Sequence, residues 1–211
     1  MRAKGKLKTE IPATTLQVLN RRAQHERSAL PSSPQKVMSM SHRNLVVLPC
    51  ILIATSTFGQ TAPRAAHADI VNAQGQKIGT AIFSPADGGV KIDVDVAQLP
   101  PGTHGVHIHG VGKCEGPDFK SAGGHLNPNA KEHGKDNPKG PHAGDLTNIE
   151  VDGGGHAKVS LSNSLVTLGG GPNSLFHEGG SALVIHEKVD DYKTDPSGNS
   201  GARIACGVIQ Q

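Results

Sequence analysis

The sequence has few aromatic residues: no tryptophan, one tyrosine and four phenylalanines among 211 residues. Proteins that bind nucleic acid usually combine aromatic side chains, on which bases stack, with a surplus of basic groups. Residues 69–211 have neither, because their 11 Lys/Arg stand against 16 Asp/Glu, a balance of −5. We therefore expect no nucleic-acid partner.

The sequence also lacks an apolar run long enough to cross a bilayer as a helix, which takes about 20 residues. The run at residues 45–55, LVVLPCILIAT, has only 11 residues and follows the basic Arg43. An A-x-A sequence, Ala66-His67-Ala68, lies downstream of it. This order describes a secretory signal peptide. We expect cleavage near Ala68, no retained membrane span, and a periplasmic or otherwise exported protein.

The first 68 residues carry 10 Lys/Arg and 2 Asp/Glu, a balance of +8, and we interpret them as a targeting segment that is not part of the folded domain. The signal peptide is assigned to residues 38–68. Residues 1–37 precede it and show no sustained period, so we expect a non-native upstream extension or a disordered segment. Met38 and Met40 stand where a signal peptide would start, and either is a candidate initiation site.

Helical periodicity is missing from residues 69–211, which we take as the folded domain. The segment Val90–Val96 alternates apolar and polar residues, the period of a half-buried strand. Glycine-rich breaks separate such runs, and 27 glycines and 14 prolines occur in the chain. The other runs are 78–83, 105–109, 148–151, 156–161, 182–186 and 203–209. Seven or eight short strands predict an all-β sandwich or barrel.

Two regions, 111–144 and 187–202, are polar, rich in glycine, proline and aspartate, and fit no strand. Loops of this length in a compact domain are usually functional or disordered. Histidines gather in and beside them, so we expect the loops to be functional.

Seven side chains form a candidate two-metal site. His107 and His109 lie two apart on an expected strand, so both imidazoles leave the same face. One histidine alone would more often be an ordinary surface or core residue. A protein surface without a metal site is not expected to concentrate several histidines and an aspartate in so short a stretch of sequence. The full set is His107, His109, His125, His133, His142, Asp145 and His186.

These ligands suit zinc and copper. Three histidines and one aspartate suit a closed tetrahedral Zn²⁺, whereas an all-imidazole set with an open face suits copper. Two four-coordinate metals need eight ligands and the set has seven, so one imidazole could be shared.

Five motifs then carry a specific resemblance: GTHGVHIH from Gly102, GGHLNP from Gly123, HAGDL from His142, VIHEK from Val184 and GARIACGVI from Gly201. In this order they resemble the copper/zinc superoxide dismutases, over essentially residues 69–211. The resemblance implies an eight-stranded antiparallel Greek-key β-barrel or sandwich with two long functional loops. It also implies dismutation of superoxide to oxygen and hydrogen peroxide.

Carried over by motif, the resemblance implies one copper and one zinc per subunit, bridged by the imidazolate of His125. Copper would take His107, His109, His125 and His186, and zinc would take His125, His133, His142 and Asp145. Arg203 would dock the anion, and His125 would also transfer a proton. Asp190 would hold the free ring nitrogens of His107 and His133.

Cys114 and Cys206 are the cysteines outside the signal peptide, and export favours a disulfide between them. Such a loop of about 90 residues would stabilise the fold by roughly 4–5 kcal/mol in the chain-entropy model. Among the remaining histidines, His104 matches a structural residue beneath the copper, and we expect His156 and His177 to be surface residues.

The region 187–202 is shorter than in eukaryotic cytosolic members and resembles that of bacterial exported ones. Steering residues therefore cannot be carried over, and Lys193, or Lys113 and Lys120, are candidate substitutes. The sequence allows a homodimer but does not decide between monomer and dimer. Copper would come from an unidentified source.

Two other functions would use a similar set of metal ligands. A copper carrier or zinc store would keep the barrel without catalysis, but the chain retains all four copper ligands and Arg203. A zinc hydrolase would need an open zinc position, and the three-histidine, one-aspartate set is closed.

Overall fold

The computed structural model describes residues 65–211, so the predictions for residues 1–37 and for most of 38–68 lie outside the described residues. The described part is all-β, as predicted, and its only helix is a single 3-10 turn at Lys120–Ala122. The strands are β1 (Ala66–Asn72), β2 (Lys77–Ala86), β3 (Gly89–Val96), β4 (Gly102–His104), β5 (Val106–His109), β6 (Ile149–Val151), β7 (Ala157–Asn163), β8 (Ala182–His186) and β9 (Arg203–Val208).

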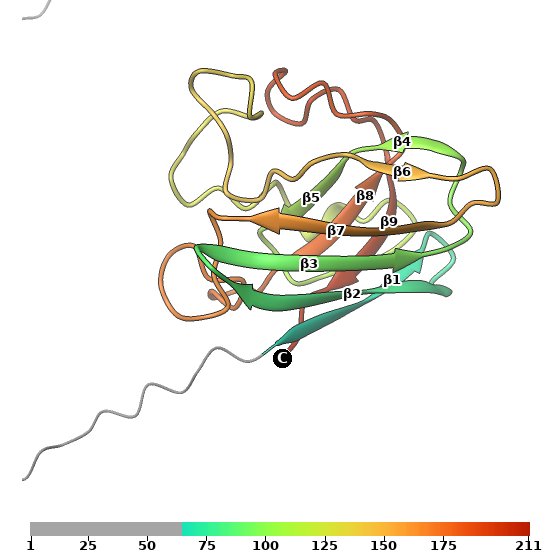
Figure 1. The fold of residues 1–211 in the computed structure, drawn as a ribbon, viewed down its shortest axis with the longest axis horizontal. Coiled ribbons are helices and arrows are strands. Elements are labelled where there is room, and N and C mark those ends of the chain that lie inside the picture. The colour runs from blue at the N-terminus through green and yellow to red at the C-terminus, as the bar shows by residue number, and fades with distance from the viewer. Residues whose placement is uncertain (1–64) are drawn as a thin grey trace, which may run out of the picture. The chain divides into compact units, whose positions relative to one another are not determined.

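The strands form a seven-stranded antiparallel sheet in the order β5-β8-β9-β1-β2-β3-β7 and a two-stranded sheet of β4 and β6 (Figure 1). Within the larger sheet the last strand, β9, lies beside β1, the first of the three hairpin-connected strands β1, β2 and β3, so the two ends of the domain are paired. The structure has nine strands because β1 and β4 lie outside the seven predicted runs. Gly105 separates β4, which pairs with β6, from β5, which pairs with β8.

Most buried apolar residues form one core cluster, to which the strands contribute alternate residues. Along β3, Val90, Ile92, Val94 and Val96 are at most 1% exposed, whereas the intervening charged residues point outward. The predicted strand 90–96 is therefore confirmed, as are the other six predicted runs to within a few residues. Burial of alternate apolar residues on one face is the main driving force for this arrangement.

Strand β1 is the element that the sequence interpretation missed. It begins at Ala66, three residues before the predicted domain start at residue 69. Ala66 and Ala68 are buried, and His67 exchanges two backbone hydrogen bonds of 2.8 Å with Gln210. The A-x-A sequence read as the end of the signal peptide thus also has the period of a half-buried strand.

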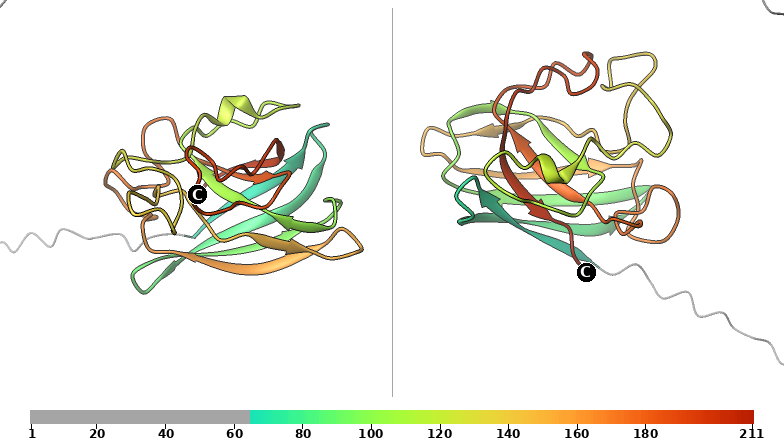
Figure 2. Two further views of the ribbon diagram at one scale, coloured as in Figure 1. Left: turned by 90° about the horizontal axis from the view of Figure 1, so that it is seen from above. Right: turned by 180° about the vertical axis from the view of Figure 1, so that it is seen from behind.

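The second half of the long loop 110–148 lies beside the loop 187–202 on one side of the sheets in Figure 1 and in the right-hand view of Figure 2. Tyr192 links them: its carbonyl accepts a hydrogen bond from Asp136 N–H at 3.0 Å, and its hydroxyl accepts one from Asn148 N–H at 2.8 Å. These are the regions predicted to be functional. Across residues 65–211, no helix combines the length and apolar character needed to cross a membrane.

Candidate metal centre

Strands β5 and β8 place three histidines on their outer face, away from the core. His107 and His109 alternate with Ile108, which points into the core. All residues of β5 are nevertheless buried, because the long loops cover the histidine side. His186 ends the neighbouring strand β8 and is 3% exposed. The period of the strand therefore aims these rings at the space under the loops.

A fourth histidine, His125, reaches the same space because the long loop pairs with the free edge of β5. Leu126 N–H donates to Ile108 O at 2.8 Å, and Ile108 N–H donates to Gly144 O at 2.8 Å. A side chain at Gly144 would collide with the carbonyl oxygen of Ile108. The glycine between His142 and Asp145 thus permits the close approach that brings both loop segments to the strand.

The four histidines expected to bind copper present unpartnered nitrogens to one another. One ring nitrogen from each lies within 4.8 Å of those of the others. Among residues 65–211, seven buried side-chain nitrogen or oxygen atoms lack a hydrogen-bond partner, and four of them belong to this group. A buried unpaired polar atom costs roughly 1–3 kcal/mol, so four together call for a shared ligand. The atoms are His107 Nδ1, His109 Nε2, His125 Nε2 and His186 Nε2.

The second nitrogen of three of these rings is held by a neighbouring oxygen. His107 Nε2 lies 2.8 Å from Asp190 Oδ2, and His109 Nδ1 lies 2.9 Å from Gly123 O. His186 Nδ1 is 3.4 Å from a backbone carbonyl. With its proton on the held nitrogen, each ring offers a lone pair on the other, which is the tautomer that a metal ion requires.

The second group surrounds Asp145 Oδ1. His125 Nδ1 lies 2.9 Å from this oxygen, His133 Nδ1 3.0 Å and His142 Nδ1 3.3 Å. His142 Nδ1 is also 3.3 Å from His125 Nδ1. A grouping by ligand-atom separation includes His107 in place of His142. We favour His142, since the nitrogens of His107 already face Asp190 and the first group.

Two residues join the groups. His125 presents Nε2 to the first group and Nδ1 to the second. Asp190 spans them from behind, with Oδ2 against His107 and Oδ1 3.0 Å from His133 Nε2. Gly198 packs against this contact at φ 62°, and a Cβ there would strike Asp190 and His133. The structure therefore brings together all seven predicted ligands and Asp190.

Burial sets the charge state of the first group. It lowers the pKa of His109 to about 2, of His186 to about 3 and of His125 to about 4. These rings are therefore neutral at pH 7 and able to bind a metal ion without first losing a proton.

The second group differs. Burial of His133 opposes its protonation, but hydrogen bonds to Asp145 and Asp190 prevail and raise its pKa to about 9. The pKa of Asp145 is far below its usual range: burial would raise it, but hydrogen bonds from His125, His133 and His142 outweigh that effect. A cation is therefore favoured here, and a metal ion would displace the proton of His133.

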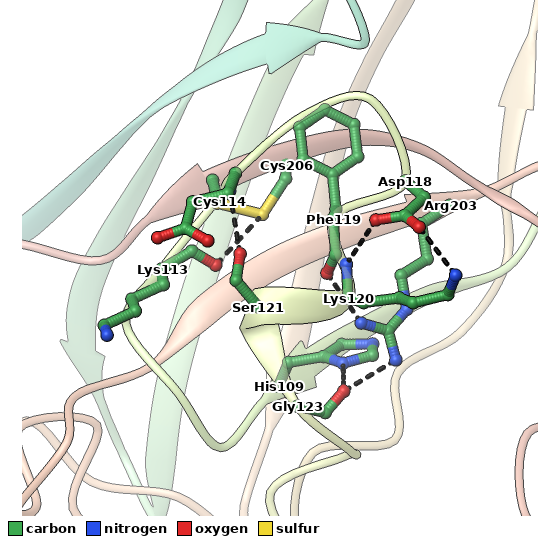
Figure 3. The surroundings of a disulfide bond; sticks show 11 residues. His109, Lys113, Cys114, Asp118, Phe119, Lys120, Ser121, Gly123, Arg203 and Cys206 are labelled. Carbon is green, nitrogen blue, oxygen red and sulfur yellow. Dashed lines mark hydrogen bonds and ion pairs between the residues drawn. A yellow bond between two sulfur atoms is a disulfide. The ribbon is translucent and has the colours of Figure 1, made fainter.

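Arg203 lies beside the first group and is held by residues 114–123, which we call the disulfide loop because Cys114 forms a disulfide (Figure 3). Its guanidinium donates to Phe119 O at 2.7 Å and to Gly123 O at 2.6 Å. The predicted disulfide joins Cys114 to Cys206 in β9, with a Cα–Cα distance of 5.6 Å. Gly123 O also contacts His109, so one carbonyl orients both a predicted copper ligand and the arginine.

An open pocket of about 480 Å³ gives access to the first group. His109, His125, His186 and Arg203 line it. The second group meets it only through His125 and His142. Solvent and a small anion can therefore reach the copper-side rings, while His133 and the interior of the second group are closed off.

The pocket contains two charged residues that the sequence interpretation missed, Lys131 and Asp195. Of the predicted steering lysines, Lys120 lines a neighbouring pocket with Arg203 and pairs with Asp118 at 2.7 Å. The only sequence signal for Lys131 was its position between the ligands His125 and His133, six residues after the first.

The remaining histidines lie outside both groups. His104 is 3% exposed, and its ring nitrogens lie 2.8 Å from the carbonyls of His186 and Pro100, a structural role as expected. His156 is exposed. His177 is only partly exposed, and its Nε2 is buried without a partner, so this residue is less superficial than expected.

Comparison with known proteins agrees with this geometry. The family model described as copper/zinc superoxide dismutase matches residues 77–209. A copper–zinc superoxide dismutase of Aquifex aeolicus is 56% identical over 146 residues, 68% of this chain and 86% of the relative.

A superoxide dismutase-like protein of Bacillus subtilis is 44% identical over 161 residues, 75% of this chain and 79% of the relative. The solved structure of the copper/zinc superoxide dismutase from Brucella abortus superposes with a TM-score of 0.57 at 28% identity, covering 69% of this chain and 99% of that one. The chain belongs to the copper/zinc superoxide dismutase family.

Proposed function

We propose that this protein dismutates superoxide at a copper ion that shares one imidazole with a structural zinc ion. The observation that carries the proposal is the convergence of four buried, unpartnered imidazole nitrogens at the base of a pocket lined by Arg203. The donor types fit both metals. Copper is assigned to His107, His109, His125 and His186, and zinc to His125, His133, His142 and Asp145.

Copper would supply the one-electron redox chemistry, and zinc, which has no redox chemistry, would fix the loop. Two superoxide anions and two protons give one oxygen molecule and one hydrogen peroxide. Arg203 attracts the anion, because a fixed positive charge in a cleft raises the local anion concentration. His125 faces both groups and can hold a proton at Nε2, which it gives to the reduced product. Asp190 keeps His107 and His133 in the required tautomers.

The test uses matched histidine variants of the protein loaded with copper and zinc. His186→Ala removes a copper-side nitrogen that has no other partner, so superoxide consumption should fall to background. His156→Ala changes an exposed ring outside both groups and should leave the rate unchanged. Equal rates in wild type and His186→Ala would refute the copper assignment. A loaded, folded wild type without turnover would favour a copper carrier.

Export is part of the proposal. The disulfide and the bacterial relatives suit an exported protein. Residues 38–68 would be the signal peptide, with cleavage near Ala68. Because Ala66 and Ala68 are buried in β1, the strand favours a cut just before Ala66 over one after Ala68. The intact mass of the exported protein decides between these positions, and a peptide from residues 1–37 would show that translation starts upstream of Met38.

A homodimer and an unidentified copper source stay predictions. Native mass spectrometry of the exported, metal-loaded protein tests the first by giving the mass of the assembly directly.

A further inference from the structure

Asp195 lies where the two long loops meet and has no role in the assignment above. Its Oδ1 accepts a hydrogen bond from the backbone N–H of His133 at 2.7 Å. The same oxygen lies 3.7 Å from Nε2 of His142. The carboxylate belongs to the loop 187–202, and both partners belong to the loop 110–148. Asp195 therefore contacts two neighbouring members of the second group from the outside.

The chemistry of His142 explains why an acid is useful at this place. Its Nδ1 faces Asp145 and His125, so a zinc ion bound there leaves the ring proton on Nε2. A metal-bound imidazole usually donates this outer N–H to a carboxylate or carbonyl, which fixes the ring and raises its basicity. Within residues 65–211, Asp195 supplies the only carboxylate oxygen that lies within 4.0 Å of His142 Nε2.

The contact is adjustable. A separation of 3.7 Å exceeds a hydrogen bond, and the Asp195 side chain is 49% exposed, so it has room to turn toward His142. Asp195 also lines the pocket that receives the anion, where a negative charge opposes entry. Its location is thus unfavourable for the substrate and favourable for the zinc group.

We propose that Asp195 is a positioning residue for the zinc site. Its carboxylate orients His142 through Nε2 and fastens the loop 187–202 to the loop 110–148 through His133 N–H. The inference rests on the proposed function, because it takes His142 as a zinc ligand. Zinc binding would then be coupled to the seating of the loop that borders the copper-side pocket.

Zinc affinity of the copper-free protein, measured by competition with a chromophoric chelator, tests this role without any assay of activity. Asp195→Asn retains an oxygen that can accept from His133 N–H but removes the charge beside His142. We expect it to weaken zinc binding about 10-fold, the lower end of the range for such outer partners. Asp195→Ala removes both contacts and should weaken binding at least as much. The control is Asp136→Asn, which changes an exposed acid in the same loop, 110–148, and should bind zinc like the wild type.

Four outcomes of these affinity measurements would contradict the inference or the zinc assignment beneath it. Wild-type affinity in both Asp195 variants overturns the inference. Weak binding in Asp195→Ala with full rescue in Asp195→Asn also overturns it, since only the link to His133 would then matter. His142→Ala serves as the reference: if it binds zinc like the wild type, the zinc assignment of the proposed function fails. A normal loss in His142→Ala with no loss in Asp195→Asn rejects the role of Asp195 alone.

Discussion

At the scale of single residues, the site depends on imidazoles whose two nitrogens have separate partners. His107 turns Nε2 to Asp190 and leaves Nδ1 free, and His109 turns Nδ1 to Gly123 and leaves Nε2 free. Both rings are buried and neutral. Their free nitrogens can therefore bind a metal ion, whereas burial keeps solvent from hydrogen-bonding to them. The choice of nitrogen is thus fixed by the outer partner before any metal arrives.

Arg203 provides the first residue-scale prediction. Arg203→Ala should lower the second-order rate with superoxide about 10-fold or more at low salt, because it removes the fixed charge beside the copper-side rings. The rate should also lose much of its salt dependence, as stopped-flow measurements over a series of ionic strengths would show. Arg203→Lys, which keeps the charge, should retain part of both. An unchanged rate at low salt in Arg203→Ala rejects the steering role.

Lys131 is predicted to be a second attracting charge at the pocket. The side chain of Asn127 accepts from Lys131 N–H at 3.0 Å and donates to Lys131 O at 2.8 Å, which fixes the backbone of the lysine. Lys131→Gln should therefore lower the rate roughly 3-fold at low salt and have little effect at high salt. Lys158→Gln, on the distant strand β7, is the matched control. Equal losses in the two variants would show a general charge effect and contradict a local one.

At the scale of elements, the disulfide loop and β9 act as one support for Arg203. Phe119 and Ala122 of the loop pack with Val184 and Cys206 in a separate apolar cluster on the outer side of β8. The carbonyls of Phe119 and Gly123 that hold the guanidinium come from this loop. Fixing the loop therefore fixes the arginine.

Removal of the disulfide should consequently affect both stability and rate. The double variant Cys114→Ser, Cys206→Ser should lose about 2–5 kcal/mol of unfolding free energy, because the denatured chain is no longer cross-linked. Urea unfolding measures this loss. The superoxide rate under fully native conditions should also fall as Arg203 loses its fixed position. A stability loss with the rate and its salt dependence intact would contradict the link between loop and arginine.

Asp191 gives the loop 187–202 a predictable acid sensitivity. Its carboxylate accepts hydrogen bonds from Thr194, Lys193 and Asn199. These bonds, led by the Thr194 hydroxyl, lower its pKa from 3.8 to about 2. Because the folded pKa lies below the unfolded one, the stabilisation is complete above about pH 4 and disappears as pH falls through about 2.

The difference in unfolding free energy between wild type and Asp191→Asn should therefore shrink as pH falls from 5 to 2. Urea unfolding of the metal-free proteins at several pH values measures it, with Asp136→Asn as control. The effect will be small, since Asp191 is exposed to solvent. A difference that stays constant over this range would show that the ionised carboxylate is not what stabilises the loop.

At the scale of the whole molecule, the sequence predicted the strands whose two faces differ most. Strand β3 alternates buried valine or isoleucine with charged residues, which identifies it without a structure. Strand β1 was missed because its inward residues include two small alanines within an A-x-A sequence, and β4 because three residues are too few to show a period. Strand breaks such as Gly105 depend on pairing partners that are distant in the sequence.

Six of the seven predicted ligands could be found in the sequence because each stands in a short motif, and His133 lies between two of those motifs. Lys131 and Asp195 could not, because their importance comes from the folding of two loops against each other. The balance of −5 for residues 69–211 gave no hint of a local anion site either. The charged side chains that line the pocket are Arg203, Lys131 and Asp195, a local balance of +1 within a domain of −5. The field at the site depends on nearby charges more than on the total charge of the domain.

The central claim is an open copper position and a closed zinc position joined by His125. Metal analysis and superoxide consumption, measured on the same sample after loading with both metals and removal of excess, test it most directly. We expect one copper and one zinc per chain, with rapid superoxide consumption. One bound copper per chain without turnover would contradict it.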